Sequence, residues 1–135
     1  MTVPVYMLDT SILSDLIRNA NGKSYKKVVE HGSDAICSSM IVAAELRYGC
    51  IKKGSAVLTA RVESLLARIQ IFAFDAPADA EYGRIRSALE ATGRVIGNND
   101  MFIAAHACAL GMVLVSNNQR EFSRVPGLTT EDWLA

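Results

Sequence analysis

The sequence predicts an α/β fold with a mainly parallel central sheet flanked by helices. Short apolar segments alternate along the chain with longer segments that repeat apolar residues at helical spacing. The apolar segments at 71–74 and 112–115 have no polar face, as in strands that are buried on both sides of a parallel sheet. After a Pro-Gly turn, a last short strand is expected near Leu128.

The first third of the chain predicts two strands and three helices. Residues 3–8 are apolar and partly β-branched, as in a buried strand, and 12–17 carry apolar residues at helical spacing. A polar turn then leads to a short basic helix at 24–30. A brief strand is expected at 36–37. The helix at 40–53 follows a pair of serines, either of which can cap it, and precedes a glycine that can end it.

Three further helices are expected in the rest of the chain. The segment 57–69 is amphipathic, and 77–92 has a proline in its first turn and a glycine just after it. Asn98 or Asn99 can cap the helix at 98–110. The length of 135 residues suits one core, so 1–135 is interpreted as a single domain.

The composition limits the classes of function. The chain has 14 basic and 14 acidic residues, so any contact with a nucleic acid must come from local patches or from a metal site. No apolar run reaches the roughly 18 residues of a membrane span, and the first residues lack the pattern of a signal peptide. Three cysteines without close metal-ligand spacing are expected to be reduced core thiols, which favours a cytoplasmic protein.

Three acidic residues each lie alone in a long stretch without other charges. Asp9 is the only charged residue in 1–14, Glu45 in 35–46, and Asp100 in 95–119. These stretches are apolar and are expected to be buried, and a buried carboxylate without a partner is costly. Gathering the three acids around a divalent cation would stabilise them, and oxygen ligands suit Mg²⁺ or Mn²⁺.

Four segments carry a resemblance to a known family. They are 7–11 (MLDTS), 44–49 (AELRYG), 97–107 (GNNDMFIAAHA) and 115–122 (VSNNQREF). In this order they resemble the PIN-domain ribonucleases, specifically the VapC-type toxins of bacterial toxin–antitoxin pairs, and the resemblance covers essentially the whole chain. It implies a PIN-like three-layer sandwich and a Mg²⁺- or Mn²⁺-dependent endonuclease that cleaves RNA.

The resemblance also implies roles for particular residues. Asp9 and Asp100 would bind the metal directly, and Glu45 would bind it or orient a metal-bound water. Many PIN domains carry a fourth acid after the fourth strand, where this chain has an asparagine. The residues with expected auxiliary roles are Asn118 as a neutral replacement, Glu121 as a substitute acid if its segment is helical, and Thr10 and Ser116 as hydrogen-bonding groups.

Partners follow from the same resemblance. A VapB-type antitoxin is expected to inhibit the protein, and operator DNA is expected to be contacted only through that antitoxin. The helices at 40–53 and 55–70 carry more apolar residues than one sheet-facing stripe would bury, so a homodimer is expected.

The sequence also allows each of these acids a purely structural role. Asp9 could only cap the first helix, Asp100 could only stabilise a helix start, and Glu45 could pair with Arg47 or Arg86. A non-catalytic Mg²⁺-binding signalling module of the receiver type is the alternative function. It fits less well, because a receiver needs adjacent acids after its first strand and a late lysine, and no lysine follows Lys53.

Overall fold

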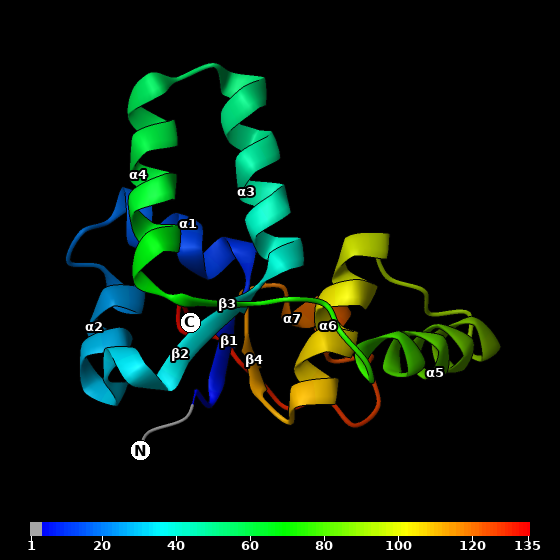
Figure 1. Cartoon of the computed structure of the whole chain (residues 1–135). Helices are drawn as coiled ribbons and strands as arrows, with labels where there is room; N and C mark the ends of the chain where they lie inside the picture. The colour runs from blue at the N-terminus through cyan, green and yellow to red at the C-terminus, as the bar shows by residue number, and fades with distance from the viewer. Residues whose placement is uncertain (1–3) are drawn as a thin grey trace.

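A five-stranded, all-parallel sheet forms the centre of the molecule (Figure 1). The computed structural model describes residues 4–135. The expected α/β class is therefore confirmed, although Val3, the expected start of the first strand, lies outside the described residues. The strands are β1 (Tyr6–Leu8), β2 (Ile36–Ser39), β3 (Gln70–Phe72), β4 (Val113–Val115) and β5 (Thr130–Glu131).

The strand order creates a switch point in the middle of the sheet. The order is β3-β2-β1-β4-β5, so the chain builds outwards from β1 in one direction and then crosses over to build β4 and β5 in the other. Leu8 pairs with Val115 at the carboxyl ends of β1 and β4. In open parallel sheets, ligands bind beyond the carboxyl ends of strands at such a point.

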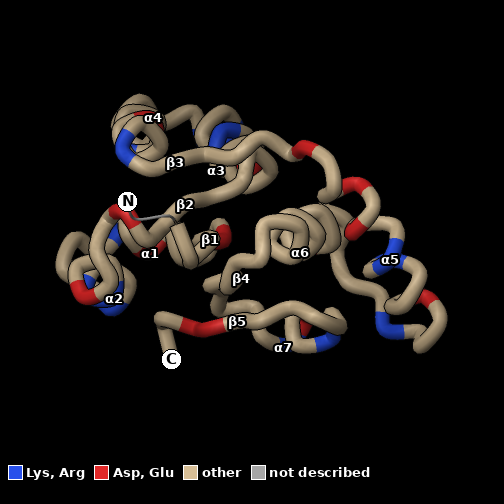
Figure 2. Tube along the Cα trace, turned by 60° about the horizontal axis from the view of Figure 1, so that its bottom comes forward, with Lys and Arg blue, Asp and Glu red and all other residues tan. Residues whose placement is uncertain are grey.

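Helices cover both faces of the sheet (Figure 1 and Figure 2). In Figure 2, α1 and α2 lie on one face, α6 lies on the other with α5 outside it, and the α3–α4 hairpin stands at the β3 end. Lysine and arginine lie on helices and loops and are absent from all five strands. The helices are α1 (Thr10–Arg18), α2 (Lys23–His31), α3 (Met40–Lys53), α4 (Ala56–Arg68), α5 (Ala78–Ala91), α6 (Asn98–Leu110) and α7 (Gln119–Phe122).

The helix boundaries follow local capping chemistry. Ser39 precedes α3 and its hydroxyl accepts a hydrogen bond from the backbone N–H of Ile41 at 3.0 Å. Gly54 ends α3 with a φ of 64°, a left-handed conformation that a side chain would disfavour.

One expected cap is wrong. The helix at 98–110 has its expected bounds, but Asn98 and Asn99 lie inside α6, and the residue before the helix is Gly97, whose O accepts from the Met101 N–H at 3.0 Å. The last strand lies near Leu128, as expected, and starts two residues after it, because the N–H of Leu128 is still directed into the preceding turn.

The core lies between the sheet and its helices. Its fully buried side chains include Met7 and Leu8 of β1, Leu114 of β4 and Ile103 of α6. Burying such side chains is the main favourable term in folding. Among the helices of residues 4–135, none combines the length and apolar composition that crossing a membrane requires.

Candidate active site

Asp9 lies at the carboxyl end of β1 and is 6% exposed. Its Oδ2 accepts a hydrogen bond from the hydroxyl of Ser116, which directly follows β4, at 2.7 Å. Asp9 occupies the residue before α1, but Ile12 and Leu13 donate to its backbone carbonyl, and its carboxylate makes no capping bond. The reading of Asp9 as only a helix cap is therefore wrong.

Glu45 extends from α3 towards the same end of the sheet. The hydroxyl of Thr10 donates to its Oε1 at 2.6 Å, and the side-chain amide of Asn99 donates to its Oε2 at 3.3 Å. Both partners are neutral. The two hydrogen bonds orient the carboxylate and leave its negative charge unpaired.

The proposed structural partners of Glu45 are occupied elsewhere. Arg47 binds Glu63 through two hydrogen bonds of 2.9 Å, and Arg86 binds Glu90 at 3.2 Å. A structural ion pair for Glu45 with either arginine is therefore wrong.

Asp100 completes the predicted set from the first turn of α6. The side-chain amide of Asn118 donates to Asp100 Oδ2 at 3.2 Å and to Glu121 Oε2 at 3.1 Å. Glu121 lies in α7, so the helical segment required for its expected role is present. The structure thus brings Glu121 beside Asp100 as a fourth carboxylate.

The carboxylates of this cluster strongly perturb one another. The pKa of Asp100 is raised to about 8. Burial is the largest cause, followed by the hydrogen bond to Glu121 and by the negative charges of Asp9, Glu121 and Glu45. Burial also raises the pKa of Asp9, against the hydrogen bonds from Ser116 and Thr10, and Glu45 adds to the rise.

Glu121 carries the charge of the Asp100–Glu121 pair. Its pKa is lowered first by the hydrogen bond from protonated Asp100, then by those from Asn118 and the backbone of Gly97, and by Arg124. Within residues 4–135, no lysine or arginine lies within 4 Å of Asp9, Glu45 or Asp100. Arg124 is thus the basic residue whose charge acts on the cluster, through Glu121, and in this part of the chain Asp9, Glu45 and Asp100 have no ion-pair partner.

The expectation that all three isolated acids are buried is correct only for Asp9. Glu45 and Asp100 are partly exposed, and both line an open hollow with Gly97, Asn98 and Asn99. The carboxyl edge of the sheet is open here because the first turn of α6 lies at the surface. A substrate can therefore reach these two carboxylates from solvent.

The donor set fits a hydrated divalent cation. Carboxylate oxygens are the ligands that Mg²⁺ and Mn²⁺ prefer. Within residues 4–135, no three Asp, Glu, His or Cys side chains are arranged to hold one ion together. Mg²⁺ is commonly held by only one or two carboxylates and keeps several waters, so this arrangement remains compatible with it. Asn118 directs its NH₂ group at the acids and would have to turn its amide over to act as a ligand.

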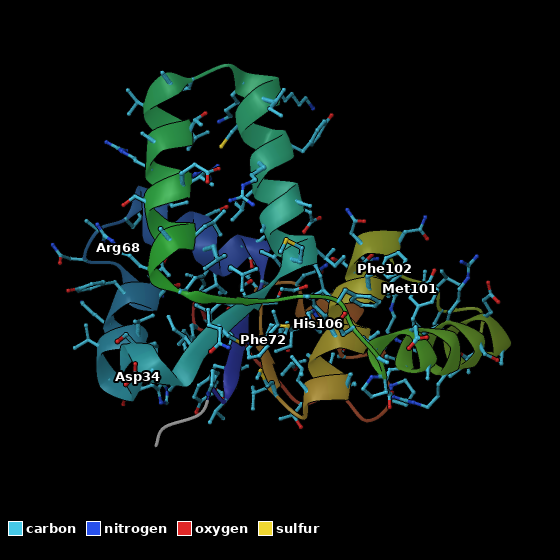
Figure 3. The ribbon with its side chains drawn as sticks, viewed as in Figure 1. Asp34, Arg68, Phe72, Met101, Phe102 and His106 are labelled. Carbon is cyan, nitrogen blue, oxygen red and sulfur yellow. The ribbon has the colours of Figure 1, made fainter. Side chains whose placement is uncertain are left out.

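His106 is a core residue (Figure 3). Its Nδ1 lies 2.7 Å from the hydroxyl of Ser39, and Ser39 already accepts from the N–H of Ile41. The ring also donates to the backbone of Ala73, so in the neutral ring, which carries a single N–H, Nδ1 accepts from the Ser39 hydroxyl. Burial lowers the pKa of His106, so the ring is neutral near pH 7. This network joins the start of α3, which carries Glu45, to α6, which carries Asp100.

Sequence reasoning missed Asn99 as a site residue. It was interpreted only as a helix cap, whereas its amide binds Glu45. Its position directly before Asp100 in a helix start was the available signal.

Comparison with known proteins adds independent information. The family described as PIN domain matches residues 6–128. "Ribonuclease VapC2" of Rickettsia felis is 41% identical over 132 residues, covering 96% of this chain and 98% of that protein. "tRNA(fMet)-specific endonuclease VapC" of Shigella flexneri is 38% identical over 129 residues, covering 95% and 97%. The crystal structure of VapBC2 from Rickettsia felis, bound to a DNA fragment from its promoter, superposes with a TM-score of 0.86 at 38% identity, covering 95% and 98%.

The raised pKa of Asp100 predicts how metal-free stability depends on pH. The carboxyl titrates near 3.8 when unfolded and near 8 when folded, so the folded state binds more protons between these values. The free energy of unfolding therefore falls as pH rises from about 4 to 8. Asp100→Asn removes this loss. After allowance for partial exposure, we expect a gain on the order of 1 kcal/mol at pH 8, or about 3–5 °C in Tm.

Thermal unfolding in EDTA at pH 5 and pH 8 measures this gain. The gain should shrink at pH 5, where Asp100 is already protonated in the folded state. The exposed Asp34→Asn variant is the control and should show no such pH dependence. Equal effects of Asp100→Asn at both pH values would contradict the assignment.

Proposed function

The chain belongs to the PIN-domain family and, within it, to the VapC-type ribonucleases, and on this premise we propose that it is a metal-dependent endoribonuclease acting as the toxin of a toxin–antitoxin pair. The whole span 1–135 is taken as one PIN domain. The proposal rests on one observation above all: four carboxylates converge at the switch point of the sheet, and within residues 4–135 none of them forms an ion pair with a lysine or arginine. Such a cluster attracts a divalent cation.

The proposed catalytic roles follow from the contacts of each side chain. Asp9 and Asp100 would hold Mg²⁺ or Mn²⁺, with Ser116 fixing the orientation of the Asp9 carboxylate. When bound, the cation supplies positive charge at the phosphorus and makes water more acidic. Oε2 of Glu45 has a single long hydrogen bond, from Asn99, and faces the open hollow, so it can accept a proton from an attacking water.

Thr10 and Asn118 have supporting roles in this proposal. Thr10 fixes the opposite oxygen of Glu45, and Asn118 bridges Asp100 and Glu121. Glu121 is the substitute for the acid that many PIN domains carry after the fourth strand. Neutral donors thus orient the acids without cancelling the charge that binds the cation.

A receiver-type signalling module is disfavoured by topology. Receiver domains have the strand order 2-1-3-4-5, whereas the order here is 3-2-1-4-5. The two orders place the switch point between different strands, so the acids of this chain do not correspond to those of a receiver.

The partners we propose are RNA as substrate and a VapB-type antitoxin as inhibitor. The similar Rickettsia felis protein is a VapBC2 complex bound to promoter DNA, and we propose that this chain contacts operator DNA only through its antitoxin. The Shigella flexneri relative is named as specific for tRNA(fMet), which makes a transfer RNA the first substrate to test. An RNA-cleaving toxin of this kind acts in the cytoplasm.

Cleavage should depend on both the metal and the acids. Purified protein is expected to cut RNA with Mg²⁺ or Mn²⁺ and to stop when EDTA is added. Asp9→Asn and Asp100→Asn should each lower the rate by at least about 100-fold, because each removes a proposed metal ligand. Gel analysis of labelled RNA measures this, with Asp34→Asn as the control. Full activity of folded Asp100→Asn protein would refute the proposed site.

Substitutions at Asn118 test whether this residue is only auxiliary. Asn118→Ala should reduce cleavage far less than Asp9→Asn, because it removes a bridging amide and not a charge. Asn118→Asp adds a carboxylate between Asp100 and Glu121 and should tighten metal binding. Calorimetric titration with Mn²⁺ decides this. A binding curve identical to that of the wild type would show that residue 118 does not act on the metal.

A homodimer is the expected assembly. This expectation rests on eight apolar residues of α3 and α4, namely Ile41, Val42, Leu46, Ile51, Val57, Leu58, Leu65 and Leu66. Among them Ile51 and Val57 are exposed, at 81% and 64%, and Tyr48 of α3 is 64% exposed. The exposed patch is thus smaller than the sequence suggests, because α3 and α4 pack against each other and against α1 and β3, and α3 also packs against β2 and α6. Light scattering over a dilution series should give a dimer, and Ile51→Glu should shift it towards monomer. A wild-type monomer at tens of micromolar would contradict the dimer.

A further inference from the structure

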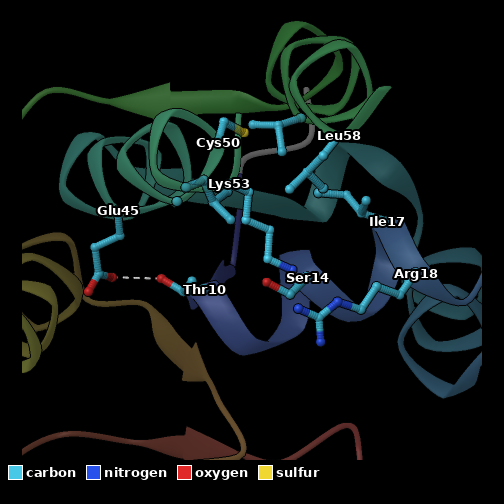
Figure 4. A pocket seen from close by; sticks show the side chains of 11 residues that line it. Thr10, Ser14, Ile17, Arg18, Glu45, Cys50, Lys53 and Leu58 are labelled. Atoms are coloured by element: carbon cyan, nitrogen blue, oxygen red, sulfur yellow. Dashed lines mark hydrogen bonds between the residues drawn. The ribbon is translucent and has the colours of Figure 1, made fainter. Parts of the chain in front are cut away.

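A second hollow lies directly beside the acid cluster (Figure 4). It has a volume of about 160 Å³ and is lined by α1, α3 and α4. Thr10 and Glu45, joined by their 2.6 Å hydrogen bond, form the end nearest the cluster. Glu45 also lines the open hollow around Asp100, so one side chain separates the two spaces. A molecule bound at the cluster can therefore extend into this pocket.

The far end of the pocket carries two basic side chains. Arg18 is the last residue of α1 and Lys53 is the last residue of α3, and Figure 4 shows both side chains reaching into the pocket beside Ser14. Within residues 4–135, neither has a carboxylate within 4 Å. Two like charges at the end of the pocket opposite Glu45, without an ion-pair partner among these residues, favour binding of an anion there.

The local contacts of α1 leave Arg18 available. Asp15, three residues earlier, would be its natural ion-pair partner on a helix. Its Oδ1 instead accepts from the Asn19 side chain at 2.6 Å and its Oδ2 from the Ser24 N–H at 3.3 Å. Arg18 is thus left for a partner from outside the chain.

The wall between the two charged ends is apolar. It is formed by Ile17, Leu46, Cys50, Leu58 and Val62. Cavities of about 150 Å³ can hold one six-membered ring. A pocket that combines an apolar wall with a basic end suits a nucleotide, because a nucleotide has a flat ring and a charged phosphate.

We propose that this pocket binds one nucleotide of a single-stranded RNA, next to the bond cleaved at the acid cluster. Arg18 and Lys53 bind the phosphate of that nucleotide, and the apolar wall contacts its base. The inference rests on the proposed ribonuclease function and adds the path of the substrate strand to it. Helix dipoles favour basic residues at the carboxyl ends of helices. They do not explain why α1 and α3 direct their last basic side chains into the same pocket beside the acids.

The first test removes the two charges. The double variant Arg18→Gln/Lys53→Gln is compared with Lys52→Gln/Arg68→Gln, which loses the same charge from the last turns of α3 and α4 but lies outside the pocket. Binding of a short labelled single-stranded RNA is measured by fluorescence anisotropy in EDTA, on an Asp100→Asn background, over a range of salt. The pocket variant should bind about tenfold more weakly and lose about 0.7 from the salt slope, as for one lost phosphate contact. The control should change less than about twofold.

The second test fills the pocket without changing its charge. Gly49 lines the pocket, and a Cβ added to it meets nothing within 4 Å. The Cβ of Gly49→Leu therefore meets no clash, and the variant should raise KM for RNA several-fold and change kcat much less, with its fold checked by circular dichroism. Gly83→Leu is the matched control, since Gly83 is also helical and equally open but lies on α5. Equal kinetics for the two variants would overturn the pocket assignment.

The outcomes separate the inference from the proposed function. If the wild type cuts RNA and both double variants bind it equally, the pocket assignment fails and the ribonuclease stands. If the wild type binds RNA through the pocket but never cuts it, the ribonuclease fails. If Arg18→Gln/Lys53→Gln leaves RNA binding unchanged but abolishes capture by the co-expressed antitoxin, the pocket is a protein-binding site and the inference is refuted.

Discussion

Electrostatic repulsion among four carboxylates is the constraint on which the candidate site depends. Asp9, Glu45, Asp100 and Glu121 converge at one edge of the sheet, and burial, together with the neighbouring carboxylates, raises the pKa of Asp100 to about 8. The fold stabilises them with neutral donors, namely the hydroxyls of Thr10 and Ser116, the amides of Asn99 and Asn118, and the backbone N–H of Gly97. Neutral donors fix the directions of the carboxylates but leave their charge, so the site retains its attraction for a cation.

The parallel sheet and its helices hold these acids together. The switch point places Asp9 beside Ser116, whose backbone N–H also bonds across to β5. The buried His106–Ser39 hydrogen bond then links α6 to the start of α3, so that Asp100 and Glu45 share one support. A neutral histidine suits this task, because a protonated ring could not accept from the Ser39 hydroxyl.

The net charge of the chain is zero, but acidic and basic side chains are separated locally around the site. Glu45 lies between an acidic hollow that suits a cation and a pocket whose far end carries two unpaired basic side chains. A phosphodiester strand has negative charge at every linkage. In the proposed arrangement, a cation would bind one end of the strand and side chains would bind the other directly, which would give the strand a defined direction without a basic protein overall.

The sequence by itself determined the α/β class, most of the elements and three of the clustered acids, because apolar periodicity and isolated charges are local properties of the chain. The four motif segments also specified the family. Only the tertiary structure decided which side chains meet. It turned the Asn118 amide towards two acids, brought Glu121 to the cluster and paired Asp15 with Asn19 and Ser24, leaving Arg18 opposite Lys53. A side chain's partner depends on the packing of segments far apart in the sequence, and periodicity carries no information about that packing.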